Sequence, residues 1–156
     1  MSERWTWAIR YAVVIVLALI LAVALGEMDL FKTTRLGKSG FNAARLVQFL
    51  GFGGALLVFW LLAQRAALQI EGRNALWSLV KNILLPLATL VVVACAHAVA
   101  LLALGPLMNK TWLQIYNWVF IAAIVLSAAW LVAALFTGSS SLAPLFAKGR
   151  KRTGGE

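Results

Sequence analysis

The sequence predicts an all-α integral membrane protein, an antiparallel bundle of four transmembrane helices. Of its 156 residues, 63% are hydrophobic and only 12% are charged, and the apolar residues gather in four long runs. Soluble domains are about 45–50% apolar and about 25% charged. A soluble fold of this size leaves too much surface exposed to hide so many apolar side chains, whereas a bilayer accommodates them.

The four apolar runs set the expected boundaries of the spans. Because about 20 apolar residues cross a bilayer, we expect spans near residues 5–25, 43–70, 83–104 and 112–136. Arg10 lies close enough to one end of the first span for its side chain to reach the headgroups. This span also has the basic start and the Ala22-Val23-Ala24 motif of a cleavable signal peptide. We expect it to be retained as a helix, with cleavage as the alternative.

Residue types at the ends of these runs predict where the helices begin and end. Asn42 is expected to cap the second helix, and Glu71-Gly72 to end it. Pro86 is expected in the first turn or so of the third helix, where its missing N–H matters little. Thr111 and Gln114 have the spacing of a capping box at the start of the fourth.

The connections between the spans are short, and we find no soluble domain within them. In the connection of residues 72–82, Leu76, Trp77 and Val80 share one helical face, which predicts a short amphipathic helix in the membrane interface. We therefore expect one transmembrane domain over residues 1–137, followed by a flexible basic cytoplasmic tail over residues 138–156.

Basic residues divide unevenly between the two sides of the membrane, and Lys and Arg in short loops favour the cytoplasm. Nine lie near the termini or the middle connection: Arg4, Arg10, Arg65, Arg73, Lys81, Lys148, Arg150, Lys151 and Arg152. Five lie on the other side: Lys32, Arg35, Lys38, Arg45 and Lys110. We therefore expect both termini in the cytoplasm, and the protein in a bacterial inner (plasma) membrane.

Three polar residues within the spans are candidates for a site. His97, Gln48 and Asn117 all fall in the outer half of the membrane and are expected to share a small polar cavity or to form hydrogen bonds between helices. His97 is the only histidine, so a haem or metal ligand is the alternative to a structural role, which we favour. Cys95 is two residues away, about 200° around the helix, and faces away from His97.

Small residues in the second span predict close helix packing. Gly51 and Ala55 are four residues apart, and Gly54 lies between them. Such positions let helix backbones approach one another in lipid. We expect this face to meet a partner helix, within the chain or in another subunit.

The tail carries a basic cluster of Lys148, Arg150, Lys151 and Arg152. Two interpretations are open: it binds anionic lipid headgroups or an acidic partner, or it only fixes the topology. The net charge of +9 does not indicate nucleic-acid binding, because no RNA- or DNA-binding module is visible.

The sequence contains no phosphate-binding glycine loop, serine elbow or HExxH motif, and every acidic residue lies outside the spans. We therefore expect no catalytic residue, metal site or cofactor. The favoured hypothesis is an accessory or assembly subunit of a membrane complex, or a homo-oligomer. Two alternatives are a channel or small-solute transporter with a pore between copies, and a haem- or quinone-associated subunit that uses His97.

Overall fold

The computed structural model describes residues 6–36, 41–70 and 75–139. Its four long helices are each long and apolar enough to cross a membrane. They are α1 (Thr6–Glu27), α3 (Ala43–Gln69), α4 (Ala75–Leu104) and α5 (Lys110–Ser139). The expected all-α class with four membrane-spanning helices is therefore confirmed.

Short elements join the long helices at one end of the molecule. Between α1 and α3 lie α2 (Asp29–Thr33) and the antiparallel pair β1 (Arg35–Leu36) and β2 (Phe41–Asn42), in which Arg35 is opposite Asn42. The 3-10 helix η2 (Gly105–Leu107) lies between α4 and α5.

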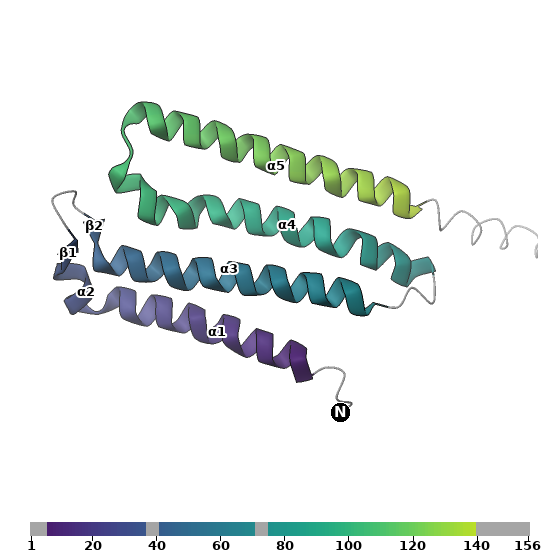
Figure 1. Cartoon of the computed structure of the whole chain (residues 1–156), viewed down its shortest axis with the longest axis horizontal. Coiled ribbons are helices and arrows are strands. Elements are labelled where there is room, and N and C mark those ends of the chain that lie inside the picture. The colour runs from purple at the N-terminus through teal and green to yellow at the C-terminus, as the bar shows by residue number, and fades with distance from the viewer. Residues whose placement is uncertain (1–5, 37–40, 71–74, 140–156) are drawn as a thin grey trace, which may run out of the picture.

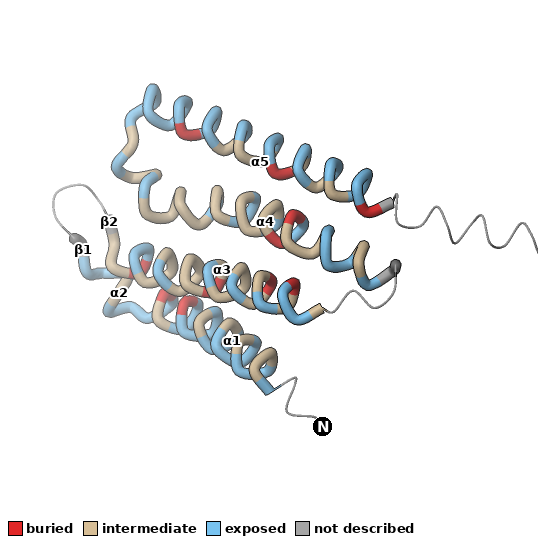
Figure 2. Tube along the Cα trace, turned by 45° about the vertical axis from the view of Figure 1, so that its right-hand side comes forward, coloured by how far each residue is buried: buried red, intermediate tan, exposed pale blue. Residues whose placement is uncertain are grey.

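The long helices lie in a row in chain order, as Figures 1 and 2 both show. α1 packs against α3, α3 against α4, and α4 against α5, each antiparallel to the next. The buried side chains lie along these contacts and are mostly small: Ala22, Ala44, Ala55, Ala63, Ala67, Ala88, Tyr116 and Ser127. Such a row suits lipid, where helices associate by close backbone packing rather than by hiding apolar surface from water.

Among the described residues, the row separates the basic side chains as the sequence predicts, with Arg10, Arg65 and Lys81 towards one end and Lys32, Arg45 and Lys110 towards the other. The start of α1, the end of α3, the start of α4 and the end of α5 lie at one end of the row, and the short elements lie at the other (Figure 1). Which end faces the cytoplasm stays a prediction.

The third helix begins earlier than expected. α4 starts at Ala75, so residues 75–82 continue the spanning helix and the separate amphipathic helix is wrong. Pro86 consequently lies about three turns into α4, not in its first turn. Proline is tolerated inside transmembrane helices because neighbouring groups satisfy the freed backbone atoms.

The cap of α5 also differs from the prediction. α5 begins at Lys110, and the Asn109 side-chain oxygen accepts a hydrogen bond from the Trp112 backbone N–H at 2.9 Å. Asn109 therefore caps the helix, and the capping box of Thr111 with Gln114 is wrong.

The remaining predicted helix ends have mixed outcomes. Asn42 directly precedes α3 as expected, but its side chain makes no capping hydrogen bond. α3 ends at Gln69, and Glu71-Gly72 lies outside the described residues.

Candidate functional site

Polar and aromatic side chains meet where α4 packs against α5. His97 on α4 contacts Tyr116, Asn117 and Phe120 on α5, and we call these four residues the His97 cluster. His97 Nε2 lies 3.3 Å from Asn117 Oδ1, and the Tyr116 hydroxyl donates a hydrogen bond to the His97 carbonyl oxygen at 2.7 Å. Because an amide oxygen only accepts, Nε2 carries the proton when this pair forms a hydrogen bond.

Aromatic rings fix the orientation of the imidazole. The His97 ring stacks on Tyr116 with centroids 5.4 Å apart and meets Phe120 edge-on at 5.2 Å. Tyr116 and Phe120 are themselves 4.7 Å apart, and Tyr116 is only 8% exposed. The cluster therefore has the geometry of a structural joint between two helices.

The depth of the cluster explains why antiparallel helices bring its members together. His97 lies seven residues before the end of α4, and Asn117 lies seven residues after the start of α5. At the helical rise, both are about 10 Å from the same end. On α5, positions 116 and 120 are four apart, a spacing that places Tyr116 and Phe120 on one face of the helix.

Gln48 does not join the His97 cluster, so the expected three-residue cavity is wrong. The Gln48 side chain packs against Gly26 on α1, where an added Cβ would lie 2.7 Å from Gln48 Cγ. Gln48 occupies the face of α3 that meets α1, whereas His97 and Asn117 lie at the contact between α4 and α5.

The small residues of α3 divide into packed and unpacked positions. A Cβ added to Gly51 would lie 2.5 Å from Ala22 Cβ and 3.2 Å from the Ala18 carbonyl oxygen, so α1 and α3 touch there. Ala55, one turn further, is 4% exposed. Gly54 has nothing within 4 Å of an added Cβ. It lies about 60° around the helix from Gly51, which places it beside the contact rather than in it.

A second hydrogen-bonded link joins α3 to α4. Trp60 Nε1 donates to Thr89 Oγ1 at 3.3 Å, and the Thr89 hydroxyl donates to the Leu85 carbonyl oxygen at 2.8 Å. This chain of two bonds satisfies a tryptophan N–H within the membrane. Sequence reasoning missed it, because depth alone does not give the rotation of a helix.

Cys95 lies apart from the His97 cluster. Its side chain is exposed and lines a groove of about 320 Å³ formed by α1, α3 and α4. The groove is apolar, and its lining residues are Ile15, Leu19, Phe52, Ala55, Leu56, Phe59, Val91, Cys95 and Val99. In the described part of the chain, no three His, Cys, Asp or Glu side chains gather as a metal site would require.

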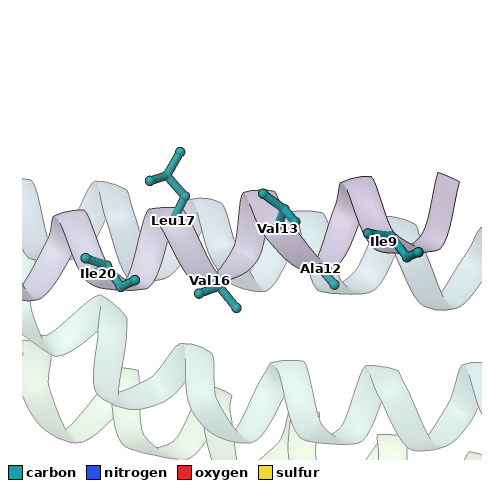
Figure 3. A pocket seen from close by; sticks show the side chains of 6 residues that line it. All are labelled: Ile9, Ala12, Val13, Val16, Leu17 and Ile20. Atoms are coloured by element: carbon teal, nitrogen blue, oxygen red, sulfur yellow. The ribbon is translucent and has the colours of Figure 1, made fainter. Parts of the chain in front are cut away.

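A shallower hollow runs along α1 alone. Figure 3 shows that the six side chains lining it all come from this helix. They are Ile9, Ala12, Val13, Val16, Leu17 and Ile20. Because this surface is wholly apolar, it matches the acyl chains of lipid and carries no polar chemistry.

The predicted basic cluster of Lys148, Arg150, Lys151 and Arg152 lies outside the described residues. Comparison with protein-family models, with curated proteins and with solved structures gives no match. Function is therefore inferred from the chain's own residues.

Proposed function

We propose that this chain is a non-enzymatic accessory or assembly subunit of a membrane complex, packing beside other subunits or beside copies of itself. The observation that supports this proposal is the row of helices, in which α5 packs against α4 and turns an amide-bearing face outward. Location in a bacterial inner membrane with cytoplasmic termini is part of the same proposal, supported by the bias of basic residues.

Two exposed amides lie on α5: Gln114 is on the face turned away from α4, and Asn117 is at the edge of the contact with α4. Gln114 and Asn117 are three residues apart, and both are exposed. His97 engages the Asn117 oxygen, but within the described ranges no hydrogen bond engages the Asn117 NH₂ group or the Gln114 amide. Polar groups in hydrocarbon favour partners on a neighbouring helix, with bonds worth about 0.6–2 kcal/mol each. A second protein helix beside α5 would supply them.

The opposite edge of the row is different. The hollow along α1 is lined only by apolar side chains, and Figure 3 shows Val13, Val16 and their neighbours there. Lipid satisfies such a surface without any protein partner. We therefore assign the subunit contact to α5 and the lipid boundary to α1.

Site-specific photo-cross-linking in native membranes tests this assignment. A photoreactive residue at position 121 replaces Ile121, which lies on the outward face of α5 and is 50% exposed. The matched control is Val13 on α1, which is 57% exposed. We expect one discrete protein adduct from position 121 and only lipid adducts from position 13. Equal protein adducts at both positions, or lipid alone at position 121, would contradict the proposal.

A Gln114→Leu variant sharpens the test. It removes one outward amide while keeping the bond between His97 and Asn117. The adduct at position 121 should fall in this variant and persist in Val125→Leu, a change at an apolar position of the same exposed face.

A further inference from the structure

A basic and aromatic cluster lies at the end of the row opposite the short elements. Arg65 on α3 places its guanidinium carbon 5.6 Å from the centre of the Trp7 ring and 6.0 Å from that of Tyr11, both on α1. Arg65 Nη1 also donates to Tyr11 Oη at 3.4 Å. Contacts with aromatic faces stabilise a guanidinium in a fixed position. We call Arg65, Trp7 and Tyr11 the Arg65 cluster.

Within the described residues, no acidic side chain forms an ion pair with Arg65. Across residues 6–36, 41–70 and 75–139, the one ion pair joins Lys32 to Glu27 at the opposite end of the helices. Arginine carries five N–H donors in a planar fork that fits phosphate oxygens, and Tyr11 engages one nitrogen of this fork. Arg65 is exposed, so the rest of the fork is accessible to a ligand.

A second donor in the cluster lacks an acceptor. Trp7 Nε1 is buried and makes no hydrogen bond. Arg10 follows Trp7 by three residues on the same side of α1 and is exposed. Arg65 and Arg10 are therefore two exposed positive charges close to Trp7, and this arrangement favours an anion with several oxygen acceptors.

The depth of the cluster identifies where such an anion comes from. Arg65 lies four residues before the end of α3, and Trp7 is the second residue of α1. At the helical rise, Arg65 is about 6 Å from the helix end. This is the level at which tryptophan and arginine side chains meet lipid headgroups.

We propose that Arg65, with Arg10, Trp7 and Tyr11, binds the phosphate of an anionic lipid at the contact between α1 and α3. The guanidinium fork holds two phosphate oxygens, and the rings of Trp7 and Tyr11 keep the guanidinium in place. The acyl chains of the lipid continue along the apolar helices. A lipid held there bridges the two helices and is independent of the basic tail.

Lipid binding to the full chain in mild detergent tests the proposal. Delipidated protein is titrated with phosphatidylglycerol or phosphatidylcholine, and bound lipid is counted by native mass spectrometry. We expect Arg65→Gln to weaken phosphatidylglycerol binding about tenfold, the effect of one lost charge-assisted contact. Lys81→Gln, at an exposed basic position of α4 near the same end, should leave the affinity within about twofold, as a charge outside the site.

Two further variants keep the proposal falsifiable if Arg65→Gln does not fold. Arg65→Lys keeps the charge but loses the fork, so its affinity should lie between those of the wild type and Arg65→Gln. Trp7→Phe keeps an aromatic ring beside the guanidinium but weakens the cation–π contact, so it should weaken binding by a smaller factor than Arg65→Gln.

Three outcomes would overturn the proposal. Equal phosphatidylglycerol binding in Arg65→Gln and wild type would show that Arg65 is not the ligand. Equal losses in Arg65→Gln and Lys81→Gln would show a general charge effect. Displacement of the lipid by excess inorganic phosphate would show that the site takes free phosphate, whereas we expect the lipid to stay bound.

Discussion

The contact of α1 with α3 and the contact of α4 with α5 hold their helices together by different means. Gly51 lets the α3 backbone touch α1 at Ala18 and Ala22. Between α4 and α5, His97 and Tyr116 instead join large rings with hydrogen bonds. In lipid the hydrophobic effect does not drive helices together, so van der Waals packing and hydrogen bonds between helices stabilise their association. The first contact is therefore sensitive to added volume, and the second to lost donors and acceptors.

Among the variants that test this comparison, Gly51→Leu should lower the free energy of unfolding the most. The added side chain meets Ala22 and the Ala18 carbonyl, so α1 and α3 must separate. Overpacking of this kind should lower the free energy of unfolding by about 3 kcal/mol. Denaturation in mixed detergent micelles measures this change. Gly54→Leu is the matched control, because an added Cβ there meets nothing within 4 Å, and equal losses in the two variants would contradict the account.

His97→Leu should cause the next largest loss of stability. It leaves Asn117 without its partner, which should lower the free energy of unfolding by about 1–2 kcal/mol, while His97→Gln keeps a polar group and should change it less. In both variants and in the wild type, elemental analysis and visible spectra should show no stoichiometric metal or haem. A metal or haem present in the wild type and lost in His97→Gln would make His97 a ligand.

Tyr116→Phe isolates one hydrogen bond of the contact between α4 and α5. It keeps the ring on His97 and removes the hydroxyl that donates to the His97 carbonyl. The expected loss is about 1 kcal/mol in the same unfolding measurement. Trp118→Phe, at an exposed position of α5, should leave stability unchanged. A larger loss in the control than in Tyr116→Phe would remove the distinction between the two contacts.

The ion pair of Lys32 with Glu27 should contribute least to the free energy of unfolding. The hydrogen bond that the Lys32 ammonium donates to the Glu27 carboxylate raises the pKa of Lys32 above its ordinary value of 10.5. A raised pKa means that the stabilisation is present below this ordinary value and is lost as pH rises through the folded pKa. Because both side chains are exposed, Lys32→Gln should leave the free energy of unfolding at neutral pH unchanged within experimental error. A loss of stability in Lys32→Gln as large as that in Tyr116→Phe would contradict this ranking.

Hydropathy alone predicts the four spans, because each is a run of apolar residues long enough for a bilayer. Matching depths in an antiparallel arrangement also placed Asn117 at the level of His97. Depth does not give the rotation of a helix about its axis, so Gln48 was grouped with His97 although it faces α1.

The start of α4 was missed for a different reason. Leu76, Trp77 and Val80 have an amphipathic pattern that suits an interfacial helix as well as the first turns of a spanning one. At α5, Asn109 and Thr111 are both good caps by residue type, and only the hydrogen bond to Trp112 distinguishes them. The arrangement of the four helices in a row depends on the rotation of each helix about its axis, which the local sequence pattern does not determine.

The mass and composition of the particle released from native membranes without detergent test the central claim most directly. Wild-type protein in native nanodiscs should contain a second protein chain, another subunit or another copy, in fixed ratio to this one. The variant Gln114→Leu should lose that chain while keeping the contact between His97 and Asn117, whereas Val13→Leu on the apolar edge should keep it. A wild-type particle that holds one copy of this chain and lipid alone would contradict the account.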